Sequence, residues 1–181
     1  IHGGAGTVIR ENTPKELKKK YEDKLREALQ AGYSILENGG SSVDAVEKTI
    51  KILEDSELFN AGKGSVLTNE ETVEMDASIM TGSDLNAGAV ATLKTIKNPI
   101  SAARAVMEKS KHVFLSGKGA ENFAVDNGLE TVNNNYFITE KQLKQIRKIK
   151  ENKYGTVGCV ALDRSGNITA GTSTGGMMNK K

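Results

Sequence analysis

Three segments rich in glycine and hydroxyl side chains contain the residues of this sequence that could do chemistry. They are Ile1-His-Gly-Gly-Ala-Gly-Thr7, Leu58-Phe-Asn-Ala-Gly-Lys-Gly-Ser65, and Gly155-Thr-Val-Gly-Cys-Val-Ala-Leu162 with its continuation Ser173-Thr-Gly-Gly176. None has the phosphate-loop pattern, and the first lacks the glycine spacing of a dinucleotide fingerprint. Glycine clusters commonly mark turns, so each segment also has an ordinary structural interpretation. A non-catalytic protein that binds small anions through these loops stays an alternative.

The available side chains narrow the chemistry further. Cys159 is the only cysteine, and His2 and His112 are the only histidines. A four-ligand Cys/His zinc site or a disulfide framework therefore cannot be built within one chain. A hydrolase made from this chain would use hydroxyls, carboxylates, amides and an amine rather than a histidine-based triad. We expect Cys159 to be a small core residue and both histidines to be packing or surface residues.

The chain as a whole carries almost no net charge. The chain has 181 residues, with 25 Lys and Arg against 23 Asp and Glu. This balance gives no general attraction to nucleic acid or membranes, and no apolar run approaches the roughly 20 residues of a membrane span. The lysine-rich stretch 141–153 is interpreted as a solvated helix and linker, with binding to anionic surfaces as the alternative. Ile1 and His2 resemble the end of a strand whose start is absent. We expect a cytoplasmic protein, and export stays open.

Helices come first in the pattern, and strands dominate the middle and the end. Thr13 and Pro14 predict the start of a long helix with an apolar stripe that includes Leu29 and Tyr33, and Ser41 predicts the start of a second. Gly32 on the first helix would let a neighbour approach closely. Strands are predicted over 73–80, 88–93, 155–162 and 168–172, and helices over 99–109, 120–126 and after Thr139. This order favours a layered α+β fold.

Taken in order, these segments resemble the plant-type L-asparaginase/isoaspartyl peptidase family of N-terminal nucleophile hydrolases. The matching motifs are His2-Gly-Gly-Ala-Gly6, Gly40-Ser-Ser-Val-Asp-Ala-Val46, Phe59-Asn-Ala-Gly62, Val73-Glu-Met-Asp-Ala-Ser-Ile-Met80, Ala87-Gly-Ala-Val90, Gly155-Thr-Val-Gly158 and Thr172-Ser-Thr-Gly-Gly176. The resemblance implies a four-layer αββα sandwich. It also implies an inactive precursor, or zymogen, that cuts itself before a threonine, which here is the bond Gly155-Thr156.

The resemblance makes Thr156 the nucleophile. Autocatalytic cleavage would free an α-amino group, whose pKa is ordinarily about 7.7–8.0, on the residue that carries the nucleophilic hydroxyl. Thr156 could then serve as its own base, although a β-branched strand residue is its ordinary interpretation. Thr174 matches a second active-site threonine that supports the nucleophile and takes part in cleavage. Asn60 matches an asparagine that positions water or the substrate amide. Gly3 matches a segment whose backbone adjusts beside the scissile bond.

The resemblance also implies a structural sodium ion and a buried acidic group. The sodium ligands would be main-chain carbonyl oxygens, which suit a hard cation. By this match they belong to Leu53, Glu54, Ser56, Phe59, Ala61 and Lys63. No organic cofactor is expected. Asp76 is expected among buried structural polar groups rather than in an acid/base pair with Glu74.

The implied organisation is one domain made from two subunits of one precursor. Residues 1–155 would be the α-subunit part, with 139–155 as the linker to the cleavage site, and 156–181 would begin the β subunit. Two such heterodimers would form an (αβ)2 assembly. Family members hold their main substrate-binding residues after the position of Lys181, so the fragment alone is expected to be inactive. The implied reaction is hydrolysis of L-asparagine or β-aspartyl dipeptides; a glycosylasparaginase-like or protein-cleaving relative is the alternative.

Overall fold

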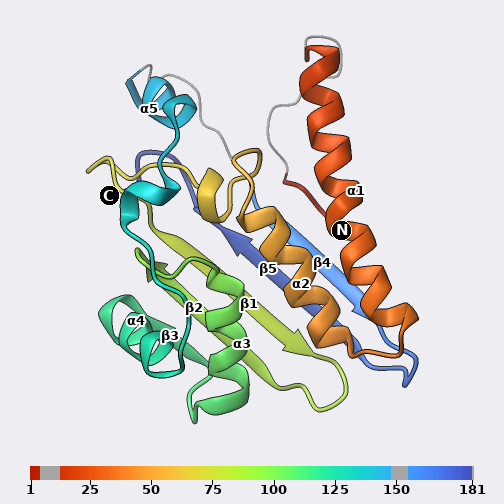
Figure 1. Cartoon of the computed structure of the whole chain (residues 1–181). Coiled ribbons are helices and arrows are strands. Elements are labelled where there is room, and N and C mark those ends of the chain that lie inside the picture. The colour runs from red at the N-terminus through yellow and green to blue at the C-terminus, as the bar shows by residue number, and fades with distance from the viewer. Residues whose placement is uncertain (5–12, 148–154, 181) are drawn as a thin grey trace.

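Five strands form one mixed sheet in the computed structural model, which describes residues 1–4, 13–147 and 155–180 (Figure 1). Their order across the sheet is β3-β2-β1-β5-β4. The strands are β1 (Met75–Thr81), β2 (Ala87–Leu93), β3 (Phe114–Ser116), β4 (Val157–Leu162) and β5 (Ile168–Thr174). β2 and β3 are parallel, and the other neighbouring pairs are antiparallel. The lysine-rich residues 148–153 lie outside the described residues.

Helices cover one face of this sheet. α2 (Ser42–Glu54) packs on β4 and β5, whereas α3 (Pro99–Lys109) packs on β1 and β2. α1 (Lys15–Glu37) lies against α2, and α4 (Gly117–Asp126) lies beside β2 and β3. The remaining helices are α5 (Glu140–Arg147) and the 3-10 turns η1 (Gly62–Gly64) and η2 (Asn134–Phe137). Within the described ranges, no helix combines the length and apolar character needed to cross a bilayer.

Local signals in the sequence explain where several elements begin. Ser41 is the N-cap of α2, and its hydroxyl accepts a hydrogen bond from the Asp44 N–H at 3.1 Å. Pro99 begins α3, because its ring suits the first helical turn, where the missing N–H is not needed. α1 begins at Lys15 with Pro14 as its N-cap, one residue later than predicted.

Alternation along β4 agrees with the predicted strand. Val157, Cys159 and Ala161 point into the core, whereas Val160 on the opposite face is 67% exposed. The prediction that Cys159 is a small core residue is confirmed, and burial raises the pKa of its thiol. Thr156 precedes β4 and shares the register of the open face rather than that of the helix-covered face.

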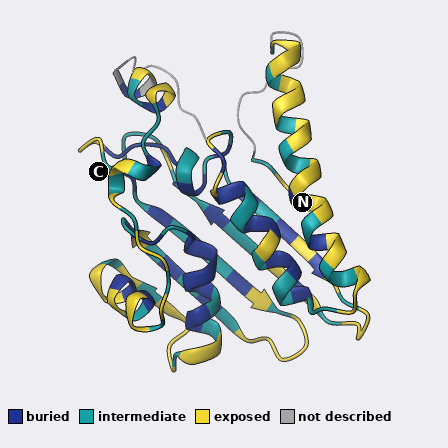
Figure 2. Cartoon of the chain, in the orientation of Figure 1, coloured by how far each residue is buried: buried dark blue, intermediate teal, exposed yellow. Residues whose placement is uncertain are grey.

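The apolar stripe of α1 is only partly buried. Ala28 and Gly32 are buried against α2, but Leu29 and Tyr33, which belong to the predicted stripe, are exposed (Figure 2). The apolar stripe of α1 is wider than the face that α2 covers. The predicted close approach at Gly32 is confirmed, because a Cβ there would collide with Thr49 Oγ1 and lie 3.1 Å from the carbonyl oxygen of Ala45.

Substitution at Gly32 should therefore destabilise the fold. We expect Gly32→Ala to lower the free energy of unfolding by about 1–3 kcal/mol, because α1 and α2 must separate to admit a methyl group. Gly119→Ala in α4 is a matched control: a Cβ there has no neighbour within 4 Å, so the change should be neutral or stabilising by up to about 1 kcal/mol. Urea denaturation of both variants measures the difference, and equal effects would contradict the α1–α2 contact.

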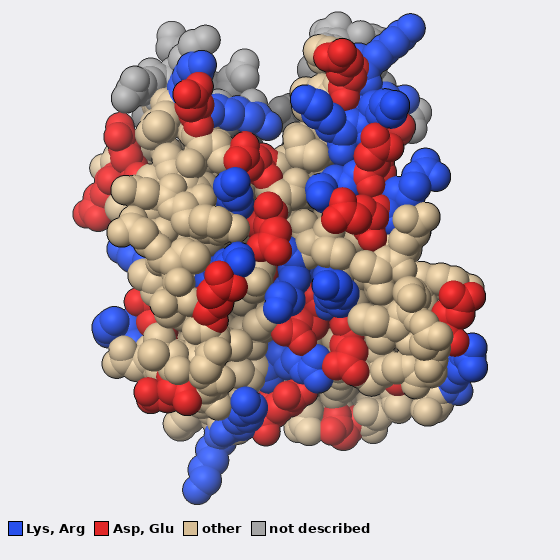
Figure 3. Space-filling model, in the orientation of Figure 1, with Lys and Arg blue, Asp and Glu red and all other residues tan. Residues whose placement is uncertain are grey.

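Charges are mixed on the helical face. Acidic and basic side chains are interspersed across the view in Figure 3. Arg104 on α3 pairs with Asp44 and Glu47 on α2, each at 2.7 Å, and so ties the two helices together. The mixture of charges on this face agrees with the near-balance of acidic and basic residues in the sequence.

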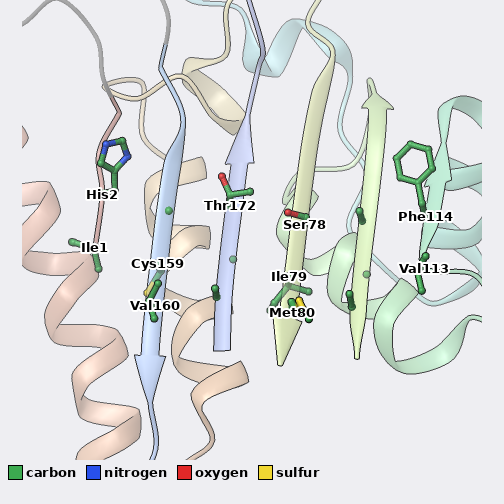
Figure 4. A pocket seen from close by; sticks show the side chains of 16 residues that line it. Ile1, His2, Ser78, Ile79, Met80, Val113, Phe114, Cys159, Val160 and Thr172 are labelled. Carbon is green, nitrogen blue, oxygen red and sulfur yellow. The ribbon is translucent and has the colours of Figure 1, made fainter. Parts of the chain in front are cut away.

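The other face of the sheet is open and apolar. Val160, Leu162 and Ile168 are exposed there, with Met80 and Phe114 on strands further across. A broad cavity of about 720 Å³ lies along this face, lined mainly by apolar side chains (Figure 4). The described residues thus form one sheet with helices on one side, and the predicted mixed α+β character is confirmed.

Candidate active site

Two threonines meet at the ends of neighbouring strands. The last pair of the β4–β5 ladder at this end is Val157 with Ser173, so the residues just beyond it, Thr156 and Thr174, come close together. Thr156 Oγ1 donates to Thr174 Oγ1 at 3.1 Å. The antiparallel hairpin therefore places a second hydroxyl beside the predicted nucleophile although the two residues are 18 positions apart.

The carbonyl group before Thr156 is held by two donors. The oxygen of Gly155 accepts from Thr174 Oγ1 at 2.9 Å and from Asn60 Nδ2 at 2.8 Å. Distances of about 2.7–3.1 Å from two donors are those of an oxyanion hole. The site is thus arranged to stabilise negative charge on the oxygen of Gly155, which is the charge that develops when a nucleophile attacks this carbonyl carbon.

Asn60 is fixed from several sides. Its Oδ1 accepts from the Val66 N–H at 2.9 Å, and its Nδ2 also donates to the carbonyl oxygen of Gly176 at 2.8 Å. The Gly175 N–H donates to the carbonyl oxygen of Asn60 at 3.2 Å. A Cβ at Gly175 would lie 2.5 Å from Ser65 Cβ and 2.6 Å from Asn60 Oδ1, so glycine is needed there. These contacts orient the side-chain amide toward Gly155.

The N-terminal glycine segment passes beside the same bond. Gly4 has φ +107°, and a Cβ there would lie 3.3 Å from the Thr156 nitrogen and 3.4 Å from Gly155 Cα. Gly3 faces Phe59 and Leu25 instead, with 3.0 Å between its ideal Cβ position and Phe59 Cε1. Within this segment, Gly4 is thus the glycine whose Cβ position faces the Gly155–Thr156 bond, and the predicted Gly3 directly precedes it.

Comparison with known proteins decides the family. A model of the asparaginase family matches residues 1–154 and 147–181. The chain belongs to the asparaginase family. Among curated members, the chain is 47% identical over 190 residues to the isoaspartyl peptidase/L-asparaginase of Mus musculus, covering 99% of this chain and 57% of the relative. The family predicted from the motifs is thus confirmed.

Two further curated relatives match the chain over a similar length. Identity is 46% over 190 residues with the isoaspartyl peptidase/L-asparaginase of Bos taurus, with 99% of this chain and 60% of the relative covered. It is 42% over 196 residues with the isoaspartyl peptidase of Escherichia coli, with 99% and 61% covered. The chain therefore spans about 60% of the length of these curated relatives.

In the loop that would hold the sodium ion suggested by the asparaginase family, two glycines pack directly against main-chain carbonyl groups. A Cβ on Gly62 would collide with the carbonyl oxygen of Glu54, and one on Gly64 would collide with that of Phe59 and lie 3.1 Å from that of Ser56. The two glycines thus allow the loop to fold tightly over these oxygens. Among the described residues, no group of three or more His, Cys, Asp or Glu side chains could hold a metal. A carbonyl donor set fits a hard cation.

The side chain of Glu54, at the end of α2, is buried. Its Oε1 accepts from the Ile100 N–H at 3.0 Å, whereas within the described residues its Oε2 has no hydrogen-bond partner. Burial raises the pKa of Glu54 to about 8, so the carboxyl group is mostly protonated at neutral pH. Glu54 therefore adds little negative charge near the loop, and its main-chain oxygen is the donor that the sodium prediction would use.

Three further side chains lie near the site. Lys180 Nζ donates to the carbonyl oxygens of Glu74 (2.9 Å) and Gly175 (3.1 Å), and so supports the turn beside Asn60; no pattern in the sequence indicates this. Asp76 is half-buried rather than buried and accepts from the Thr92 N–H at 2.9 Å. His2 is exposed and pairs with the edge of the sheet, as expected for a strand end, and its ring also lies beside Thr156.

Proposed function

We propose that the complete protein is an amidohydrolase that cuts itself at Gly155–Thr156 and then hydrolyses L-asparagine and β-aspartyl dipeptides through Thr156. The observation that carries this proposal is the pair of donors on the Gly155 carbonyl oxygen, Asn60 Nδ2 and Thr174 Oγ1. The Thr156 hydroxyl in turn donates a hydrogen bond to Thr174 Oγ1. The names of the relatives support the two substrate classes.

The arrangement supports the following course of self-cleavage. Thr156 Oγ1 attacks the carbonyl carbon of Gly155, and as its proton moves to Thr174 Oγ1, the Thr174 hydroxyl passes its own proton to the Gly155 oxygen. Asn60 Nδ2 stabilises the negative charge that develops on this oxygen. The C–N bond then breaks as the relayed proton passes to the nitrogen, which becomes the α-amine of Thr156, the Gly155 carbonyl re-forms, and an ester joins Gly155 to Oγ1. Water hydrolyses this ester, which leaves a carboxylate on Gly155 and restores the hydroxyl.

The mature reaction would use the same groups. The α-amine of Thr156 takes the proton of the hydroxyl, which attacks the side-chain carbonyl carbon of asparagine or the isopeptide carbonyl carbon of a β-aspartyl dipeptide. Ammonia or the second amino acid leaves with a proton, and a β-aspartyl ester remains on Oγ1. Water then releases aspartate. The departure of the Gly155 carboxylate would free Asn60 and Thr174 for the substrate.

We further propose that the two products of the cut stay together. β1 precedes the cut and β5 follows it, yet they pair over six positions, from Asp76 with Thr174 to Thr81 with Thr169.

A second sheet would cover the open apolar face and complete the αββα sandwich, because exposed side chains such as Val160 and Ile168 favour a packed partner. Native mass spectrometry would test the (αβ)2 assembly.

Expression of the full-length gene tests the function. Intact mass should show two fragments split between Gly155 and Thr156, and the protein should release ammonia from L-asparagine and aspartate from a β-aspartyl dipeptide. Preference for N4-glycosylated asparagine over both would favour the glycosylasparaginase-like alternative. A stable uncut chain that releases no ammonia would overturn the proposal and favour a binding protein.

Sodium should stabilise this protein if the carbonyl loop binds it. We expect the midpoint of thermal unfolding to rise by a few degrees when sodium chloride replaces choline chloride at equal ionic strength, because a ligand that binds only the folded state stabilises it. Gly64→Ala, which places a methyl group against the Phe59 carbonyl, should lose this response. An equal midpoint in both salts for the parent protein would contradict the sodium site.

A further inference from the structure

His2 is joined to the strand that follows the cleavage site. Its backbone forms an antiparallel bridge with Gly158, in which His2 N donates to Gly158 O at 2.8 Å and Gly158 N donates to His2 O at 3.0 Å. The N-terminal segment therefore lies beside the start of β4, on the edge of the sheet (Figure 4). Gly158 has no side chain, and its ideal Cβ position is 3.9 Å from His2 Cβ.

One ring nitrogen of His2 contacts backbone groups on both sides of the site. Nδ1 is 3.0 Å from the carbonyl oxygen of Thr156, and the Gly4 N–H points to it at 3.2 Å. These two groups come from segments that touch at the Gly155–Thr156 bond, because Gly4 packs against the Thr156 nitrogen. His2 Nδ1 thus lies within hydrogen-bond distance of both the glycine turn and the residue of the nucleophile.

A single ring nitrogen cannot serve both contacts at once. With a hydrogen on Nδ1, the ring donates to Thr156 O; with a lone pair on Nδ1, it accepts from the Gly4 N–H. The tautomer of His2 therefore selects which of the two backbone groups it holds. Neither contact involves the Thr156 hydroxyl, so His2 is not placed as a base.

The contact with the Thr156 carbonyl gains importance after the cut. Thr156 lies one residue before the first pair of the β4–β5 ladder, Val157 with Ser173. Once the bond to Gly155 is broken, the chain no longer restrains Thr156 from its N-terminal side. A hydrogen bond to its carbonyl fixes the plane of the Thr156–Val157 peptide, from which Cα projects with its amine and hydroxyl.

We propose that His2 is a positioning residue for Thr156, which holds the Gly4 turn against the scissile bond before cleavage and orients the new N-terminus after it. This inference rests on the proposed function. It gives a role to a residue from the other end of the chain, 154 positions away. Misplacement of a reacting group by about 1 Å can lower a rate on the order of 100-fold, so loss of this contact should be visible in kcat.

Two substitutions separate the contact at Nδ1 from the bulk of the ring. Asparagine carries an amide donor and acceptor close to the position of Nδ1, whereas glutamine carries them one bond further along, near Nε2. In the full-length protein, we expect His2→Asn to keep the cleavage half-time and kcat within about threefold of the parent. His2→Gln and His2→Leu should slow cleavage and lower kcat by roughly 10-fold to 100-fold with little change in KM, since orientation rather than binding is lost.

His112→Leu is the matched control. His112 is the only other histidine of the sequence and is exposed at the turn after α3, so its replacement should leave cleavage and kcat unchanged. A purely structural role of His2 would instead lower the thermal midpoint of all three His2 variants and leave kcat of the folded enzyme unaltered. That result, or a His2→Leu variant as fast as the parent, would overturn this inference.

A spectroscopic measurement tests the contact without activity. The double variant His112→Leu, Thr156→Ala is uncut and has one imidazole, whose nitrogen shifts report the tautomer at Nδ1. Adding His2→Leu should shift the Gly4 amide resonance and speed its hydrogen exchange; an unchanged Gly4 amide would overturn the inference. A parent that neither cuts itself nor releases ammonia overturns the proposed function as well, whereas an active parent with unaffected His2 variants overturns this inference alone.

Discussion

Thr156→Ala should leave the precursor uncut and should abolish measurable hydrolysis of asparagine. The variant lacks the hydroxyl that attacks the Gly155 carbonyl, and without the cut it also lacks the α-amine that serves as base. Removal of an enzyme's nucleophile commonly lowers kcat on the order of 10⁴-fold to 10⁶-fold. Intact mass over several days at 37 °C, together with ammonia release, measures both losses.

Controls for this variant come from the same strands. Thr156→Ser keeps a hydroxyl on the same residue and should still cut itself, although more slowly. Thr172→Val removes a hydroxyl that donates to the Val157 carbonyl at 2.9 Å, two residues before Thr174, and should cut at nearly the parent rate. If Thr156→Ala still splits between residues 155 and 156, Thr156 is not the nucleophile of self-cleavage.

Asn60→Asp should slow self-cleavage by about 10²-fold to 10³-fold, the usual effect of removing one oxyanion donor. The carboxylate keeps an acceptor for the Val66 N–H, but it cannot donate to the carbonyl oxygens of Gly155 and Gly176. The fraction of intact precursor against time gives the rate.

Two companion variants separate the loss of the donor from other effects. Asn60→Ala removes the same donor without adding charge, so it should slow cleavage to a similar degree. Asn135→Asp on η2, where the side chain is exposed, controls for the amide-to-acid change and should have the parent rate. If Asn60→Ala cuts as fast as the parent, the two hydrogen bonds on the Gly155 oxygen do not assist the reaction.

Elements with strong local signals are predictable from the sequence. The cap at Ser41 and the proline of α3 act through neighbouring residues, and the alternation in β4 follows from burial of one face. β3 is not predicted because it is only three residues long and pairs with β2 at the edge of the sheet, so its formation depends on a partner far away in sequence. Leu29 and Tyr33 show the same limit, since periodicity does not reveal how much of a helix its neighbour covers.

The site residues are accessible only through the family pattern. Thr156, Thr174 and Asn60 are ordinary strand and turn residues in composition, and Asn60 reaches Gly155 across 95 positions of sequence. The packing of Gly4 and the bridge formed by His2 depend on where the first residues lie against β4. No spacing within the N-terminal segment encodes that position.

Because β5 lies between β1 and β4 in one sheet, the proposed cut would change the molecularity of refolding. Before the cut, the strands on the two sides belong to one covalent chain, and the sheet can re-form by closing a loop. After the cut, refolding would require two separate polypeptides to meet, so recovery would depend on protein concentration. The working lifetime of the cut enzyme would then be governed by the rate at which its shared sheet opens, rather than by the equilibrium stability of its precursor.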